Sequence, residues 1–230
     1  MGSFFTPAFK YFFIIVVTLA MGFSVWLLPQ ATKIKEESIT ITTPIDSKEE
    51  AGRYLQKASE DFFYHEFDRA IENYDKAITA FEKDNQLEKA GKVYESLGDL
   101  YKFRARTKEA EAQYILAMQY QHKINNPQGE ARAMSRAGDL FMERGEYARA
   151  RKWYTKGLIL VQDLPPHQTQ AVLFESMGRI YWKTEENIPE AILWYTRARD
   201  SFSALENQMG YDHMTAALNK LRGGQNLNTH

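Results

Sequence analysis

Apolar and small residues recur along most of the chain with the spacing of helix faces, and the pattern repeats after forty residues. One set of positions consists of a glycine with apolar residues on both sides, in the heptapeptides Glu95–Tyr101, Ser135–Phe141 and Glu175–Tyr181. The central glycines are Gly98, Gly138 and Gly178. A fixed period of this length is typical of stacked-repeat proteins, in which each unit buries its apolar face only against its neighbours.

A second set of positions follows each glycine and carries Ala, Tyr, then Ala or Gly, at spacings that place them on one face of a second helix. A glycine opposite an alanine lets two helix backbones approach closely, while the tyrosine fills the space beside them. Between the helices of the clearest copy, Gly145 is available for a positive φ. The second set comprises Ala110, Tyr114, Ala117, Ala150, Tyr154, Gly157, Ala191, Tyr195 and Ala198. Helices are predicted at 48–64, 67–83, 86–104, 107–123, 127–143, 146–162, 166–184, 188–204 and 207–222.

Together these positions resemble the tetratricopeptide repeat (TPR), over roughly residues 49–222. The period of forty exceeds the usual value of about 34 and is similar to that of the longer-helix variety in scaffold proteins of the kinesin light chain type. The resemblance implies an all-α, right-handed superhelical TPR solenoid of about four helix hairpins plus a C-terminal capping helix. The first copy departs from the pattern with Ala58 for the glycine and Asp61 for the aromatic residue, and the fourth carries one extra residue near Pro189.

Residues 11–28 contain no charged side chain, and Tyr11 and Trp26 lie near the two ends of this segment. A helix of this length measures about 27 Å, close to the ~30 Å hydrocarbon core of a bilayer, and amphipathic rings prefer the interface. We predict a single transmembrane helix here, preceded by an N-terminal tail. The expected domains are a tail at 1–10, the anchor at 11–28, a linker at 29–47, the solenoid at 48–222 and a disordered tail at 223–230.

A cleavable signal peptide is the alternative to this anchor, with a small-residue cleavage site at Ala20–Gly22. Cleavage there would leave an apolar stretch exposed at the new terminus, which favours the retained anchor. Basic residues are nearly balanced across the segment, with Lys10 before it and Lys33 and Lys35 after it. A short tail kept inside is the commoner arrangement for such anchors, so we expect the solenoid on the extracytoplasmic, periplasmic face.

The composition narrows the classes of function. The chain has 29 basic and 30 acidic residues, which argues against nucleic acid as a partner. It contains no cysteine, which excludes thiolate metal sites and a cysteine nucleophile. Its five histidines form no pair at metal-site spacing, and the sequence holds no Gly-rich phosphate loop or ordered catalytic triad. We therefore expect no enzymatic activity, no cofactor and no metal.

In the repeat class that the sequence resembles, the first helix of each hairpin lines a concave groove. Members that hold acidic chaperone tails use a lysine and asparagine clamp, which is absent because these positions carry Leu55, Ser59, Glu95 and Asp99. We expect instead a peptide or helix with apolar anchors. An ordinary solvated helix face is the alternative for any one of the groove positions. The resemblance implies as partner-groove candidates Phe62, Lys92, Glu95, Asp99, Phe103, Arg132, Asp139, Met142, Arg179 and Trp182.

These features predict a membrane-tethered protein–protein interaction scaffold or adaptor that binds a partner segment in its groove. The alternative is a structural or assembly subunit of a multi-protein membrane complex, in which the anchor helix also packs through small residues such as Gly22 and Ser24. A hydrolase or transferase has no support in the motifs. Neither the identity of the partner nor the oligomeric state follows from the sequence.

Overall fold

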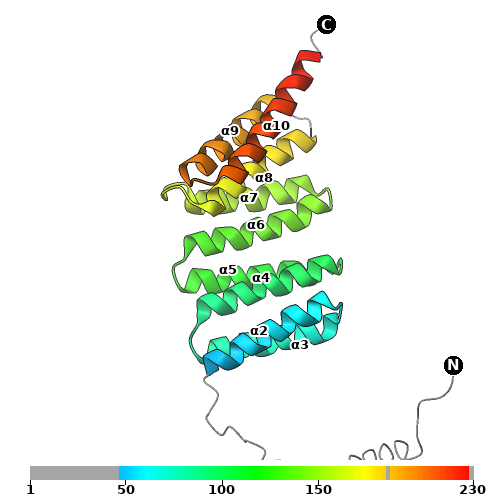
Figure 1. The fold of residues 1–230 in the computed structure, drawn as a ribbon, viewed down its shortest axis with the longest axis vertical. Coiled ribbons are helices and arrows are strands. Elements are labelled where there is room, and N and C mark those ends of the chain that lie inside the picture. The colour runs from blue at the N-terminus through cyan, green and yellow to red at the C-terminus, as the bar shows by residue number, and fades with distance from the viewer. Residues whose placement is uncertain (1–46, 185–186, 228–230) are drawn as a thin grey trace, which may run out of the picture. The chain divides into compact units, whose positions relative to one another are not determined.

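The computed structural model describes residues 47–184 and 187–227, and this part of the chain consists of α-helices joined by short turns. Consecutive helices pack as antiparallel pairs, α2 with α3 through α8 with α9, and the last helix packs on α9. The pairs stack in chain order, from α2 to α10 (Figure 1). The helices are α2 (Ser47–Phe63), α3 (Phe67–Lys83), α4 (Leu87–Phe103), α5 (Thr107–Lys123), α6 (Pro127–Glu143), α7 (Tyr147–Val161), α8 (Gln168–Thr184), α9 (Ile188–Ala204) and α10 (Gln208–Leu227).

The predicted all-α repeat arrangement is confirmed, since every helix begins within two residues of its predicted start. The end of the last helix differs from the prediction. α10 continues to Leu227, through Gly223 and Gly224, where the sequence analysis placed a disordered tail. A glycine inside a helix costs about 1 kcal/mol relative to alanine, so it weakens a helix without ending it. The right-handed superhelical twist stays a prediction.

No helix within residues 47–184 and 187–227 is both long and apolar enough to cross a bilayer. The expected anchor at 11–28, the tail before it and the predicted linker at 29–47 lie outside the described residues, except that Ser47 begins α2. The alternative of a cleaved signal peptide falls on the same residues. The transmembrane helix and the periplasmic location therefore stay predictions from the sequence.

The recurring glycines occupy equivalent places in successive pairs, as predicted. A methyl group on Gly98 would lie 2.6 Å from a ring atom of Tyr114, and one on Gly178 would lie 2.9 Å from Tyr195. At Gly138 the methyl group would be closer still to the ring of Tyr154. Tyr114 and Tyr154 are completely buried. Each glycine thus lets the tyrosine ring of the second helix pack directly against the backbone of the first.

Most turns between helices share one backbone conformation, whether they lie inside a pair or between pairs. A residue with positive φ follows the helix end, and the N–H of the next residue donates to a carbonyl five residues back, as in Arg106 to Tyr101 at 2.9 Å. This arrangement is the Schellman motif, which satisfies carbonyls at the end of a helix. The positive-φ residues of the first five turns are His65, Asn85, Ala105, Asn125 and Gly145, spaced twenty residues apart.

Replacing Ala105 by glycine should stabilise the protein by about 1 kcal/mol, because a Cβ at positive φ is strained. Ala105 has φ of 57°, whereas Gly145 has φ of 73° in the equivalent turn and an added Cβ there would meet no neighbour. Gly145→Ala should therefore destabilise by a similar amount through backbone strain alone. Urea unfolding followed by far-UV circular dichroism measures both changes, and shifts of the same sign would contradict the explanation.

Candidate functional site

The first helices of the pairs and α10 form one face of the stack, which we call the first-helix face. α4 contacts α6, and α6 contacts α8. Several ion pairs on this face join one of these helices to the next. They are Glu95–Arg132, Asp99–Arg136 and Lys102–Glu143 between α4 and α6, Asp139–Arg179 between α6 and α8, and Glu175–His213 between α8 and α10.

Glu95 and Arg132, both predicted as partner-groove residues, bind each other. The Nε and Nη2 of Arg132 donate to both carboxylate oxygens of Glu95 at 2.9–3.2 Å. Glu95 is only 6% exposed. The hydrogen bond and charge of Glu95 raise the pKa of Arg132. A buried carboxylate needs such a partner, so this pair supports the contact between α4 and α6 rather than presenting free charge.

Asp99 and Asp139 accept hydrogen bonds from the buried tyrosines of their own pairs. The hydroxyl of Tyr114 donates to Asp99 at 2.6 Å, and that of Tyr154 donates to Asp139 at 2.7 Å. Burial, and then the neighbouring carboxylate, raises the pKa of both tyrosines. The fourth copy carries Arg179 at the equivalent position, so the sign of the charge is reversed on α8.

This reversal lies beside a hollow of about 610 Å³ between α8 and α10, which we call the C-terminal hollow. Trp182 lies in its lining, with its ring 6.0 Å from that of Tyr195 and the ammonium of Lys220 5.2 Å from its centre. Lys183 and Met214 also line the hollow. The hollow therefore combines cationic side chains with aromatic and apolar surface.

A smaller hollow of about 250 Å³ lies between α6 and α8 and is lined by Arg132, Arg136, Asp139 and Ser135, among others. Ser135 is 4% exposed, and its hydroxyl has no hydrogen-bond partner among the described residues. Because Asp139 lines this hollow and Arg179 lines the C-terminal one, the two hollows flank the Asp139–Arg179 pair. The two hollows and this pair form the candidate site.

The predicted aromatic residues Phe62 and Phe103 lie in a separate cluster at the ends of α2 and α4. Their ring centres are 5.6 Å apart, and each also contacts Phe67. Phe103 is 60% exposed, and neighbouring Phe63 and Tyr64 are more so. An exposed aromatic cluster is a possible contact surface, but it contributes nothing to the two hollows.

The remaining predicted residues have local roles. Lys92 pairs with Glu88 one turn earlier on α4 at 2.7 Å and lines a small hollow of about 120 Å³ between α2 and α4. Met142 packs against the central core. Of the ten predicted residues, the structure thus brings Arg132, Asp139, Arg179 and Trp182 to the candidate site.

Sequence reasoning missed Arg136, His213 and Lys220. Arg136 lies one turn after Arg132, on the same face of α6. His213 and Lys220 belong to α10, which the sequence analysis treated as a cap. Treating α10 also as the first helix of an incomplete fifth pair would have placed its residues beside those of α8.

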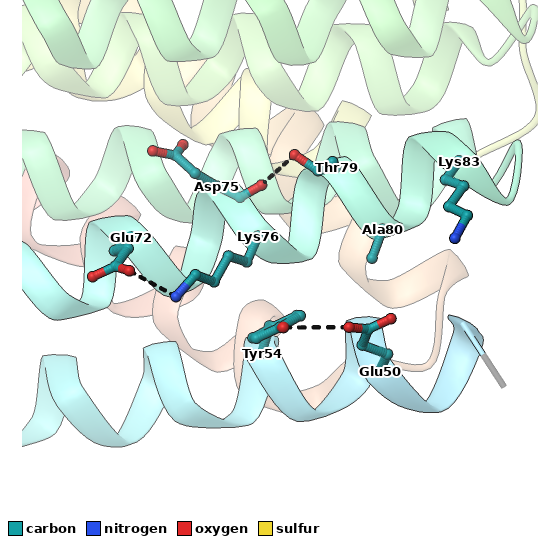
Figure 2. Close-up of a pocket in the computed structure, with 8 residues that line it drawn as sticks. All are labelled: Glu50, Tyr54, Glu72, Asp75, Lys76, Thr79, Ala80 and Lys83. Carbon is teal, nitrogen blue, oxygen red and sulfur yellow. Dashed lines mark hydrogen bonds and ion pairs between the residues drawn. The ribbon is translucent and has the colours of Figure 1, made fainter. Parts of the chain in front are cut away.

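Another hollow, of about 430 Å³, lies between α2 and α3 (Figure 2). Its hydrogen bonds run along single helices: Tyr54 donates to Glu50, Lys76 to Glu72, and Thr79 to the carbonyl of Asp75 (Figure 2). The exposed Glu72 has its pKa lowered by Lys76, whereas burial raises the pKa of Asp75. These groups satisfy one another along each helix and do not converge on a common point, so we assign no site here.

In the part of the chain that the structure describes, no three His, Asp or Glu side chains are grouped so that they could hold a metal ion. The carboxylates of Glu95, Asp99, Asp139 and Glu175 are engaged with arginine, histidine or tyrosine as given above. The first-helix face is therefore suited to binding. It carries paired charges along α4, α6 and α8, and apolar and cationic side chains at the α8–α10 end.

A family model described as soluble NSF attachment protein, SNAP, matches residues 27–159 and, in a second overlapping match, residues 87–222. Among solved structures, the apo form of RapI is similar with a TM-score of 0.66 and 15% identity, over 86% of this chain and 54% of RapI. The chain thus spans about half the length of RapI. BtubC (BKLC) from P. vanneervenii gives a TM-score of 0.43 at 15% identity, over 79% of this chain and 91% of that protein. No curated protein matches the sequence. The likeness to RapI supports the helical-repeat fold.

Proposed function

Because the chain belongs to the soluble NSF attachment protein (SNAP) family, we propose that it is a protein-interaction adaptor without catalytic activity, which receives a segment of a partner protein on its first-helix face. The observation that carries this proposal is the pair of hollows on either side of Asp139–Arg179. Here α6, α8 and α10 present side-chain-sized depressions on a helical-repeat scaffold. Such grooves receive helices or extended peptides through a few anchor residues.

The ion pairs indicate that the two ends of the first-helix face differ in the charge that they present to a partner. On α4 and α6 the carboxylate of Glu95 is buried and held by Arg132, which leaves little charge for a partner to use. On α8 and α10 the side chains of Lys183 and Lys220 are exposed beside Trp182. A half-buried tryptophan next to exposed cations is the kind of anchor point at which binding energy concentrates. The partner would therefore be held chiefly at the α8–α10 end.

Residues 11–28 would tether the adaptor to a membrane through the expected transmembrane helix, with 29–47 as the linker and the solenoid on the periplasmic face. This part of the proposal rests on the uncharged apolar segment in the sequence. The adaptor would recruit or assemble its partners at the bilayer. If it were instead a fixed subunit of a membrane complex, the anchor helix would itself contribute to assembly.

Site-specific photo-crosslinking in the full chain, in the cells that produce it, tests the proposal. A photoreactive phenylalanine analogue at position 183 on α8 should give discrete crosslinked products, whereas the same residue at position 152 on α7 should give none. Lys183 and Lys152 are both exposed, so the two positions differ in the helix face and not in access. The products at 183 should also weaken in a Trp182→Ala background. Equal crosslinking at both positions, or none at 183, would refute binding on the first-helix face.

Replacing residues 1–30 by an unrelated anchor distinguishes the two roles. The adaptor predicts that crosslinks from position 183 persist, because the partner contacts the solenoid. Loss of these crosslinks with a membrane-inserted, folded chain would favour the subunit role.

A further inference from the structure

We propose that the C-terminal hollow binds a phosphomonoester group, carried by a phosphorylated segment of the protein partner. This inference rests on the proposed function, because it assigns the chemistry of the group that the first-helix face receives. Three features of the C-terminal hollow, which has a volume of about 610 Å³, support the inference. They are its positive charges, an N–H group of Arg179 without a hydrogen-bond partner, and its aromatic surface.

The charge of the hollow favours an anion. Arg179 and Lys183 lie one turn apart on α8, and Lys220 reaches the same hollow from α10. Against these three cations stand Glu175, which lines the hollow, and Asp139, which contacts Arg179 from α6 at 3.2 Å. One positive charge therefore remains in excess. A phosphomonoester carries a charge of about −1.5 to −2 at pH 7, opposite in sign to this excess.

The guanidinium of Arg179 is only partly used within the protein. Its Nη2 donates to Asp139 and to Ser176, at 3.2 and 3.1 Å. Its Nε is buried and has no hydrogen-bond partner in the described part of the chain. Leaving a buried donor unpaired costs free energy, which an anionic acceptor would recover if the half-exposed guanidinium turned Nε toward it. An arginine with an unused donor beside two lysines is the kind of arrangement that binds phosphate through charge-assisted hydrogen bonds.

The number of cationic groups favours phosphate over carboxylate. A phosphomonoester presents three strong acceptor oxygens, whereas a carboxylate presents two. Arg179, Lys183 and Lys220 supply three separate cationic groups from two helices. The equivalent positions of α4 and α6 carry Asp99 and Asp139 in place of Arg179, so the reversal of charge is confined to this end of the face.

The apolar part of the lining favours a protein segment as the carrier of the phosphate. Trp182, Tyr195, Met214 and Ala217 provide aromatic and aliphatic surface beside the cations. A bare phosphate ion would leave this surface unused. A side chain next to a phosphorylated residue would cover it, with Trp182 as the contact point.

Fluorescence anisotropy with the full chain tests the proposal directly. The probes are three fluorescein-labelled peptide pools that share randomised flanking positions and carry phosphoserine, serine or glutamate at the centre. The phosphoserine pool should bind about tenfold more tightly than either of the others, because the charge-assisted hydrogen bonds of a dianion exceed those of a single carboxylate. Equal affinity of the phosphoserine and glutamate pools would overturn the assignment to phosphate. Inorganic phosphate at millimolar concentration should compete only weakly, since it lacks the flanking contacts.

Matched charge reversals locate the site. Lys183→Glu with Lys220→Glu should abolish the preference for phosphoserine, whereas Lys152→Glu with Lys156→Glu on α7 makes the same change in net charge and should retain it. All four lysines are exposed, so thermal unfolding should be little changed in either double variant. Persistence of the preference in the first variant, or equal loss in the second, would refute this location.

Two further outcomes distinguish this inference from binding of a lipid phosphate and from the proposed function itself. If vesicles containing phosphatidic acid bind through Lys183 and Lys220 while the peptide pools do not, the phosphate belongs to a lipid and the proposal is wrong. If position 183 still crosslinks to a partner while the three pools bind equally, the first-helix face remains the binding surface and only its phosphate chemistry is refuted.

Discussion

Replacement of Gly138 by alanine should destabilise the protein by about 2 kcal/mol or more. The added methyl group would overlap three ring atoms of Tyr154, of which even the farthest, Cζ, lies 2.8 Å away. The ring has no room to retreat, because Tyr154 is completely buried and its hydroxyl is held by Asp139 at 2.7 Å. Forcing extra atoms into a close-packed core typically costs about 1–3 kcal/mol, and this overlap is severe.

Gly52→Ala is the matched control, because Gly52 also lies inside a helix but an added Cβ there meets no atom within 4 Å. Alanine is the better helix former, so this variant should be more stable by about 0.5–1 kcal/mol. Urea unfolding monitored by far-UV circular dichroism measures both. Similar shifts for the two variants would show that the contact between glycine and tyrosine does not hold the pairs together.

This contact also explains why the helix pairs could be predicted from the sequence. Glycine and tyrosine that meet in space, such as Gly98 and Tyr114, belong to the same hairpin. The contact between glycine and tyrosine is therefore repeated once in each hairpin, and this repetition produces the forty-residue period in the sequence. The helix boundaries could be predicted as well, because the turns lie where the apolar pattern is interrupted.

The common turn geometry could not be predicted in the same way. The positive-φ positions carry His65, Asn85, Ala105, Asn125 and Gly145, and no single residue type is common to them. Their period of twenty is a property of the backbone hydrogen bonds, which close the turn whatever the side chain. Glycine and asparagine are the residue types that favour a positive φ, so the sequence signals it at Gly145, Asn85 and Asn125 but not at His65 or Ala105.

The candidate site was predictable only in part, because a helical pattern identifies a face but not what a neighbouring helix contributes to it. Asp139, Arg179 and Trp182 were found because they follow the repeating glycine. Lys220 was missed because it lies on α10, outside the four complete copies. Glu95 was assigned to the groove because nothing in its own helix reveals the arginine on α6 that neutralises it.

The second large effect on stability is expected from removing the arginine that neutralises Glu95. Arg132→Met should destabilise the protein by about 3 kcal/mol, because it leaves the carboxylate of Glu95 buried without a counter-ion. The side chain of Glu95 is 8% exposed, and Arg132 supplies three hydrogen bonds to it. Removing one partner of a buried ion pair costs about 3–5 kcal/mol, and the partial exposure of Arg132 places this case at the lower end. Methionine keeps the apolar stem, so the loss reports the charge rather than packing.

Adding Glu95→Met to Arg132→Met should restore most of the lost stability, because two apolar side chains of similar volume replace the pair and no charge stays buried. Lys92→Met serves as the surface control. Lys92 and Glu88 form a pair of similar length, but each side chain is 53% exposed, so its loss should cost about 0.5 kcal/mol. Urea midpoints of the four proteins, including the parent, measure these differences. A small effect of Arg132→Met on stability, together with loss of binding to the partner, would contradict a structural role for the pair and would show that the ion pair opens when the partner binds.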